Sequence, residues 1–262
     1  MSRDSLSWLS ALDVEYARFN AEKSVATSDR SLFSVVEVGP LTVTTDRARE
    51  ATYYNRIIGC SLTTLPWLDR ALELFDGWAF APRIDVDIQE IQSLELSLQR
   101  RGFVSRQQLI WLISGSSPKI PSTQVIRLKP DDVNRILPLL EFEGPIDRGV
   151  WALRRQHHCS ARFRIFVVEV EQELVALATT FVGKHGAVLG NAFTRPEFRG
   201  RGYQAALIAA RLADAEELGL DCVTTDVEPQ TTSLRNCERA GFKTLRHQSV
   251  WERTPVDKNK FE

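Results

Sequence analysis

The stretch that decides the fold is FRGRGYQAALIAARL, residues 198–212. Two arginines alternate with two glycines, and the alanine-rich run that follows has the apolar spacing of a helix. A glycine turn that opens a helix directs unpaired backbone N–H groups at one point, which favours an anion. Gly200 and Gly202 allow close backbone approach, and Arg199 and Arg201 can pair with phosphate. The turn therefore predicts a pyrophosphate site; a solvated surface turn and a nucleic-acid contact are the alternatives.

Two familiar phosphate-binding loops are absent from this stretch. The dinucleotide fingerprint requires a third glycine, whereas Gly200 and Gly202 are followed by Ala205 and Ala206. The loop that ends in Gly-Lys-Ser or Gly-Lys-Thr is also missing. A pyrophosphate site here would therefore belong to another class of protein.

The composition is that of a globular protein large enough for two domains. The chain has 262 residues, of which 43% are hydrophobic and 26% are charged. Its formal net charge of −1 provides no general field for holding nucleic acid or an anionic membrane. We therefore expect no nucleic-acid partner and no membrane partner.

The cysteines and the N-terminal residues favour a cytoplasmic location. None of the four cysteines stands in a CxxC pair, which predicts reduced thiols and no metal site. The first residues, MSRDSLSWLSALDVEYARF, are interrupted by acids, unlike a signal peptide. No run reaches the ~18 apolar residues that a membrane span needs.

A change of composition near the middle of the chain divides it into two halves. SGSSPKIPS, residues 114–122, combines small polar residues with two prolines and is typical of a linker. The sequence therefore predicts an N-terminal domain at 1–115, a linker at 116–122 and a second domain at 123–262.

The second half has the pattern of an α/β (α+β) fold, with a mixed, mostly antiparallel sheet flanked by helices. Short polar turns between β-rich runs predict an antiparallel meander, and a strand–helix–strand order after it predicts a parallel pair. The predicted strands lie at 123–128, 162–170, 174–182, 187–194, 220–227 and 244–254, and the predicted helices at 128–142, 149–158, 203–219 and 233–242.

The first half repeats part of this plan. The helix that ends in RRGF and the strand after it resemble RAGF and its following strand in the second half. This similarity suggests an ancient duplication, but the first half has no counterpart of RGRG. Its predicted strands lie at 31–39, 41–45, 79–87 and 107–114, and its predicted helices at 66–75 and 90–103.

FTRPEFRGRGYQAALIAARL, residues 193–212, resembles the signature of the GNAT superfamily of acyl-coenzyme A-dependent N-acetyltransferases. In that signature Arg/Gln-x-x-Gly-x-Gly/Ala opens a helix. Arg199 and Gly202 match its first and fourth positions, and Gln204 stands where glycine or alanine is usual. TTSLRNCERAGF, residues 231–242, resembles the next motif of the superfamily. The resemblance covers roughly residues 124–252 and implies a GNAT-like fold, with a degenerate GNAT-like half before it.

The resemblance also implies which residues bind the coenzyme. Backbone amides from Gly200 to Ala205 would hold the pyrophosphate of acetyl-CoA, and Asn236 would reach its pantetheine arm. A solvated amide on the helix surface is the alternative for Asn236. The residues that the resemblance assigns to acetyl-CoA are Phe193, Thr194, Arg199, Gly200, Arg201, Gly202, Tyr203, Gln204, Ala205 and Asn236.

Acetyl transfer to a primary amine needs a neutral nitrogen near the thioester and a fate for the departing thiolate. Many superfamily members use a tyrosine as the acid four residues before the Gly-Phe pair, where this chain has Cys237. A buried cysteine is more typical of a core residue than of an acid. Glu228 is the candidate base, with Asp226 on the same strand as the alternative; His157 and His158 are further acceptor-side candidates.

Two functions therefore compete. The first is an N-acetyltransferase that uses acetyl-CoA, an amine acceptor and no metal. The missing tyrosine and the degenerate half favour the second, a non-catalytic acyl-CoA sensor or scaffold. The residues that select an acceptor lie on variable loops, so the acceptor stays open. Two similar halves can cover each other's sheet edges, which slightly favours a monomer.

Overall fold

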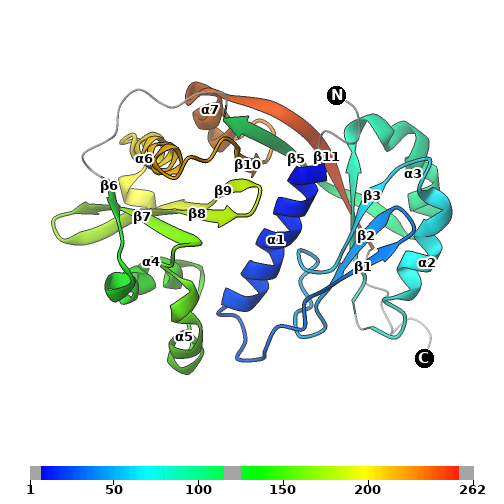
Figure 1. The fold of residues 1–262 in the computed structure, drawn as a ribbon, viewed down its shortest axis with the longest axis horizontal. Coiled ribbons are helices and arrows are strands. Elements are labelled where there is room, and N and C mark those ends of the chain that lie inside the picture. The colour runs from blue at the N-terminus through cyan, green and yellow to red at the C-terminus, as the bar shows by residue number, and fades with distance from the viewer. Residues whose placement is uncertain (1–6, 79, 115–124, 254–262) are drawn as a thin grey trace. The chain divides into compact units, whose positions relative to one another are not determined.

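The computed structural model describes residues 7–78, 80–114 and 125–253 (Figure 1). Contacts divide the chain into two compact units. Unit 1 consists of Met1–Asp29 and Trp111–Leu245, and unit 2 consists of Arg30–Ile110 and Arg246–Glu262.

This division differs from the boundary predicted near residue 115, because an N-terminal helix groups with unit 1 and the chain from Arg246 onward groups with unit 2. α1 (Ser7–Lys23) buries Leu12, Tyr16 and Phe19 in the core of unit 1. Since burial of apolar surface is the dominant favourable term in folding, α1 folds with the second half of the chain. The linker predicted at 116–122 lies outside the described residues.

Unit 1 contains the predicted antiparallel meander. Its strands lie in the order β10-β9-β8-β7-β6, and every neighbouring pair is antiparallel except β9 and β10, which are parallel. The mixed, mostly antiparallel sheet predicted from the sequence is therefore confirmed. The strands are β6 (Val125–Arg127), β7 (Phe163–Val170), β8 (Glu173–Gly183), β9 (Gly186–Thr194) and β10 (Val223–Val227).

The helices of unit 1 after β6 follow the predicted order, whereas α1 and the short η7 were not predicted. The helix predicted at 128–142 forms mostly as 3-10 turns, because Pro138, inside that range, lacks the backbone N–H that a continuous α-helical ladder needs. These elements are η4 (Pro130–Ile136), α4 (Leu137–Leu140) and η5 (Glu141–Glu143). The others are α5 (Arg148–Arg154), η6 (Arg155–His157), η7 (Pro196–Phe198), α6 (Tyr203–Glu217) and α7 (Thr232–Arg239).

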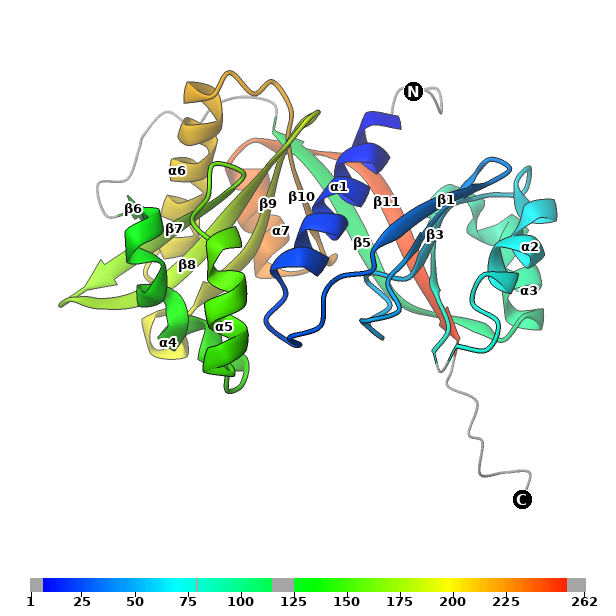
Figure 2. The same ribbon diagram turned by 60° about the horizontal axis from the view of Figure 1, so that its bottom comes forward.

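The two faces of the unit 1 sheet have separate cores. On β7, Phe163, Ile165 and Val167 pack with α1, α4 and α5, whereas Phe166 and Val168 pack with Leu207 of α6. This alternation is the period of two that a strand covered on both faces requires. Figure 2 shows β7 to β10 side by side, with α6 on one side and α4 and α5 on the other.

Unit 2 repeats the order of elements found from β7 onward in unit 1. Two antiparallel pairings, β1 with β2 and β2 with β3, precede a helix and a parallel pairing of β3 with β4. Its strand order is β1-β2-β3-β4-β11-β5, and the unit boundaries fall within β11 and β5. The elements are β1 (Ser34–Val38), β2 (Leu41–Thr45), β3 (Arg56–Cys60), η2 (Leu65–Trp67), α2 (Leu68–Glu73), β4 (Arg83–Asp87), η3 (Ile88–Glu90), α3 (Ile91–Arg100), β5 (Phe103–Ser114) and β11 (Phe242–Arg253).

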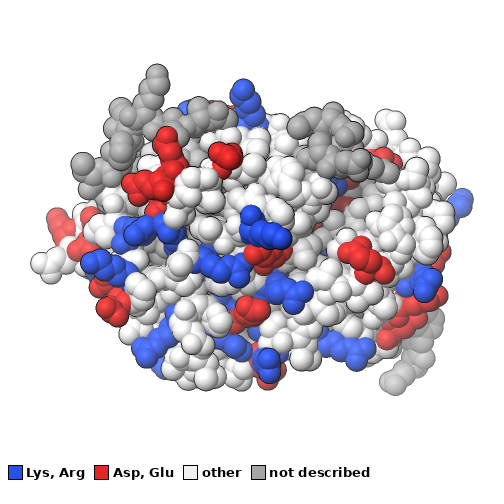
Figure 3. All heavy atoms as spheres, in the orientation of Figure 1, with Lys and Arg blue, Asp and Glu red and all other residues white. Residues whose placement is uncertain are grey.

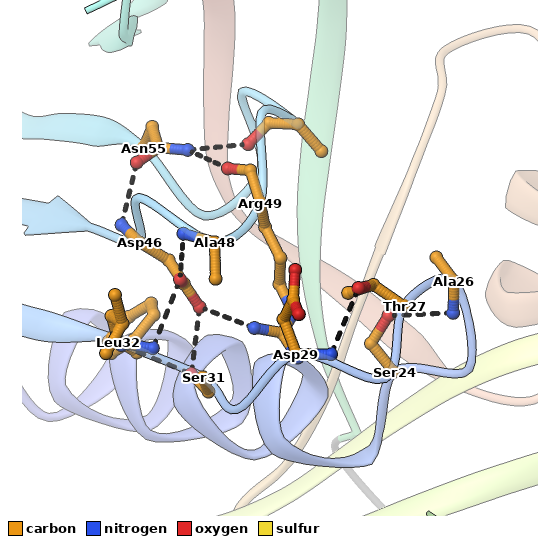
Figure 4. Close-up of polar contacts among 12 residues, drawn as sticks. Ser24, Ala26, Thr27, Asp29, Ser31, Leu32, Asp46, Ala48, Arg49 and Asn55 are labelled. Carbon is orange, nitrogen blue, oxygen red and sulfur yellow. Dashed lines mark hydrogen bonds and ion pairs between the residues drawn. The ribbon is translucent and has the colours of Figure 1, made fainter. Parts of the chain in front are cut away.

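A buried polar network holds the loop between β2 and β3. The Asp46 carboxylate accepts hydrogen bonds from the backbone of Leu32 and Ala48 and from the side chains of Ser31 and Arg49 (Figure 4). Because all of these groups serve one fully buried carboxylate, the network is structural. Figure 4 also shows the separate turn after α1, where hydroxyl groups accept backbone N–H bonds.

Within the described ranges, the structure has no helix that combines the length and the apolar character needed to cross a membrane.

Candidate active site

Strands β9 and β10 separate after a short parallel pairing. Their backbones pair only at positions 187–188 of β9 and 223–224 of β10. One step further, the Thr225 hydroxyl donates to the Leu189 carbonyl at 2.8 Å. The two strands therefore form a fork that is open beyond Leu189 and Thr225.

A bulge in β9 lies at the opening of this fork. β8 pairs Leu177 with Phe193 and Thr179 with Gly190, so β9 carries an additional residue between these pairs. Asn191, within the bulge, has a φ of +46°, a left-handed conformation that asparagine tolerates better than most residues. The bulge turns the Asn191 side chain away from the regular strand pattern.

The arginine–glycine turn leads from β9 into α6. Gly200 and Gly202 have φ values of +76° and +81°, and a Cβ atom at either position would meet nothing within 4 Å. Gly202 is the N-cap of α6, and no side chain caps the helix start. The first N–H groups of α6 therefore have no side-chain cap, a feature that suits the anion site expected from the sequence.

The two arginines of the turn do not converge on one point. The Arg199 Nε donates to the Thr194 carbonyl at 3.2 Å, and the Arg201 guanidinium lies 5.0 Å from the centre of the Phe198 ring. Both side chains are exposed. Gln204 turns back to β9, where its Nε2 donates to the Thr194 hydroxyl at 2.9 Å.

A cavity of about 200 Å³ lies between the fork and the two helices α6 and α7. Three side chains of α6, at positions 204, 208 and 211, share one helix face and line it from the first turn inward. The full lining consists of Leu189, Gly190, Asn191, Ala192, Gln204, Ile208, Arg211, Thr225, Asp226, Val227, Ser233, Asn236 and Cys237.

The cavity brings together some of the predicted residues. Gln204, Asn236 and Cys237 line it, and so does Asp226, the alternative base. Glu228 is exposed in the turn after β10 and does not contribute to the lining. Burial raises the pKa of the Cys237 thiol, and the nearby Arg211 only partly opposes that rise.

α1 adds a polar group on the opposite face of the sheet. The Asn191 Nδ2 donates to the Tyr16 hydroxyl at 3.2 Å and to the Thr179 hydroxyl at 3.1 Å. Because both hydrogens of the Asn191 amide are thus engaged, its Oδ1 is the atom left to accept from a ligand. Burial raises the pKa of Tyr16 to about 12, and the Asp226 carboxylate contributes to the rise. Tyr16 is therefore a neutral phenol at physiological pH.

The two predicted histidines lie away from this cavity. His158 is buried beside Trp151 and Phe163, with its Nδ1 3.3 Å from the Arg154 carbonyl oxygen. Burial lowers the pKa of His158 to about 3. It lines a second, wider hollow of about 570 Å³ that also includes Asp131, whereas His157 packs edge-on against Phe19.

Tyr16, Asn191 and Arg211 are not among the site residues predicted from the sequence. The apolar spacing of Leu9, Leu12 and Tyr16 was a usable helix signal for α1. The other two have no local signature, since the cavity that they line is formed by segments far apart in the chain.

Comparison with known proteins finds similarity in the region that holds the cavity. The model of the acetyltransferase (GNAT) family matches residues 133–242, a range that includes β7 to β10, α6 and α7. No curated protein matches the chain.

Solved structures share the fold along most of the chain. A GCN5-related N-acetyltransferase from Kribbella flavida is 12% identical with a TM-score of 0.60, and the match covers 95% of this chain and 98% of that one. A GCN5-related N-acetyltransferase from Sphaerobacter thermophilus is 15% identical with a TM-score of 0.58, and the match covers 94% of this chain and 95% of that one. A GNAT-family acetyltransferase from Colwellia psychrerythraea is 12% identical with a TM-score of 0.55, over 94% and 96%. At these identities the likeness shows the fold.

The family match, the forked parallel strands and the uncapped glycine turn all fall in the same part of unit 1. Residues 133–242 therefore match the model of the acetyltransferase (GNAT) family, whose members transfer acyl groups from acyl-CoA.

Proposed function

We propose that this protein is an N-acetyltransferase that moves an acetyl group from acetyl-CoA to a primary amine. The observation that carries the proposal is the course of the cavity. It starts at Gln204, beside the uncapped turn, and reaches Asn191 and Asp226 in the open fork. An anion at the turn and a reacting group in the fork would thus be joined by one continuous space.

The turn suits the pyrophosphate of the coenzyme. Its open N–H groups at Tyr203, Gln204 and Ala205 lie at the positive end of the α6 dipole. The exposed guanidinium groups of Arg199 and Arg201 can swing toward a phosphate, because each makes only a weak contact now. Phe193 and Thr194 at the end of β9, with Asn236 on α7, would contact the pantetheine arm.

The acceptor amine would approach from the face of the sheet that α1 covers. The Asn191 Oδ1 can accept a hydrogen bond from the amine, and the Asp226 carboxylate can attract its ammonium form and take its proton. Of the two carboxylates suggested by the sequence, Asp226 has the stronger support because it lines the cavity. Glu228 remains the second candidate for the base, at the mouth of the fork.

A non-catalytic acyl-CoA sensor is the second candidate function. Cys237 occupies the position of the usual tyrosine acid, and its buried thiol has a raised pKa, which makes it a poor proton donor. A sensor needs only the turn and the cavity.

Nucleic-acid binding through the turn has less support. The formal net charge is −1. On the face seen in Figure 3, basic and acidic side chains are interspersed.

Cytoplasmic location and a monomeric state stay predictions from the sequence.

Turnover with a broad panel of amines tests the proposal. The purified chain should bind acetyl-CoA and release free coenzyme A only when a primary amine is present, and the amine should gain an acetyl group by mass spectrometry. Binding of acetyl-CoA without product across amino acids, polyamines, aminoglycosides and lysine peptides would favour the sensor. Absence of binding would contradict both functions.

A further inference from the structure

Arg211 is a buried cation that lines the cavity. Only 3% of the residue is exposed. Its Nε donates to the Leu207 carbonyl at 3.1 Å, and its Nη1 donates to the Thr179 carbonyl at 3.1 Å and lies 3.5 Å from the Gly190 carbonyl. These three acceptors belong to α6, β8 and β9, so they hold the guanidinium rigidly at the base of the fork.

The carbonyl groups satisfy N–H donors without neutralising the charge. No carboxylate in the described parts of the chain forms an ion pair with Arg211, and none of the described groups accepts from its Nη2. A buried charge with no counter-ion is costly. The cavity thus offers an anion a preorganised partner with free N–H donors on Nη2.

The position of Arg211 along α6 relates it to the reacting end of the coenzyme. Gln204, in the first turn of α6, and Arg211 both line the cavity. Seven residues of α-helix span about 10 Å. If the pyrophosphate lies at the turn, as the proposed function requires, the pantetheine arm extends along α6 toward Arg211 and Cys237.

We propose that Arg211 is a catalytic residue that stabilises the coenzyme A thiolate as it leaves. This inference rests on the proposed function and deepens it, because it supplies a fate for the leaving group in a chain whose Cys237 is a poor acid. A fixed cation inside a desolvated cavity is the kind of group that stabilises charge only as it develops.

The step balances without an acid at the sulfur. The lone pair of the neutral amine forms the new C–N bond, the C–S bond breaks, and its electron pair remains on sulfur beside the guanidinium. The proton lost from nitrogen passes to Asp226 or to water. The thiolate is protonated after it has left the cavity.

Other titratable groups face this region. Their effect on the pH dependence of binding must be separated from that of the coenzyme A thiol. These groups are Cys237 and Glu238 on α7, Asp226 on β10 and Tyr16 on α1. Desolvation lowers the pKa of Arg211 to about 10, so the guanidinium stays charged up to pH 9. Desulfo-coenzyme A lacks only the thiol. The pH dependence of its binding therefore includes the effect of every protein group and excludes the effect of the sulfur.

Binding of coenzyme A and of desulfo-coenzyme A, measured by calorimetry between pH 7 and pH 9, tests the proposal. A cation beside the sulfur lowers the pKa of the bound thiol, so affinity for coenzyme A should rise with pH. If the free thiol has a pKa of about 8.5 and binding lowers it by one, the affinity ratio of coenzyme A to desulfo-coenzyme A rises about sixfold between pH 7 and pH 9. This ratio should be flat in Arg211→Met and partly retained in Arg211→Lys. Ile208→Val, which alters the same cavity without a change of charge, should keep the wild-type ratio.

A wild-type ratio that does not change with pH would overturn the inference while leaving the proposed function intact. A rise that persists in Arg211→Met would overturn it as well, because another group would then hold the thiolate. Failure of the wild-type chain to bind either ligand would overturn the proposed function and this inference together. A flat wild-type profile would overturn the inference even if Arg211→Met does not fold, and Arg211→Lys then tests whether the guanidinium is responsible for a rise.

Discussion

Replacing Gly202 with alanine should separate coenzyme binding from folding. Gly202 is the N-cap of α6 and has a φ of +81°. A Cβ atom there meets nothing within 4 Å in the protein, so its only internal effect is backbone strain. A coenzyme pyrophosphate at the helix start would, by contrast, lie directly against the new methyl group.

The same helix provides a matched control at its other end. Gly219 follows the C-cap of α6, has a φ of +68°, and a methyl group added there would also meet nothing within 4 Å. A left-handed backbone costs an L-residue about 1–2 kcal/mol. Gly202→Ala and Gly219→Ala should therefore lower the melting temperature equally, by about 3 °C for each kcal/mol.

Only Gly202→Ala should also weaken coenzyme binding. We expect its Kd for coenzyme A to rise at least about tenfold, or about 1.4 kcal/mol, while Gly219→Ala stays within about twofold of the wild type. Thermal melts and calorimetry on the three proteins give both quantities. Equal affinities of the two variants for coenzyme A would refute the assignment of the turn.

Three further predictions concern a carboxylate pair, a phenol and a buried imidazole. Asp226→Asn should lower kcat with amine acceptors by about 100-fold and Glu228→Gln by far less, since general-base catalysis typically contributes that much; steady-state rates showing the reverse order would return the role to Glu228. Tyr16→Phe removes an acceptor from Asn191 and should raise KM for the amine while the Kd for coenzyme A is unchanged; a matched rise in both would mean a general structural effect. His158 is held neutral in the folded protein, where its pKa is near 3, against about 6.5 in the unfolded chain. Its contribution to the free energy of unfolding is therefore complete above pH 6.5 and is lost as pH falls toward 3. Unfolding free energy should drop by about 2 kcal/mol between pH 7 and pH 5, measured by urea titration, and His158→Gln should flatten this slope.

Much of the fold was predictable because its strands and helices are locally encoded. The alternation in β7 and β8 and the glycine turn before α6 are signals within a single segment. Strand β3, RIIGC, was not predicted because five residues without clear alternation carry little pattern. Its pairing with β4 arises from tertiary contacts.

The candidate site was only partly predictable for a different reason. The turn and Asn236 lie in motifs that a single stretch of sequence reveals. Arg211 looks like one more charged residue of a surface helix until the bulge of β9 places the Gly190 carbonyl beside it. Tyr16 precedes Asn191 by 175 positions, so their contact depends wholly on how α1 packs.

The two parallel strand pairs differ in a way that explains why the proposed coenzyme site lies in unit 1 and has no counterpart in unit 2. In unit 2, β3 and β4 stay paired at four positions, and their side chains fill the core, so no fork opens. The loop after β3, which corresponds to the arginine–glycine turn, satisfies its own donors. Ser61 donates to the Thr64 hydroxyl at 2.8 Å, and Leu65 donates to the Ser61 carbonyl at 2.9 Å.

Another donor of that loop already bonds to an anion. The Leu62 N–H bonds to the Glu90 carboxylate at 3.1 Å, so a side chain of unit 2 occupies the role that a phosphate would have in unit 1. A duplicated loop can thus keep its place in the fold and lose its ligand by two changes, capping of its N–H groups and closure of the strands behind it. Unit 2 folds with the corresponding loop closed, so the helix start at Gly202 is not left uncapped by any requirement of the fold, which supports its proposed role in binding.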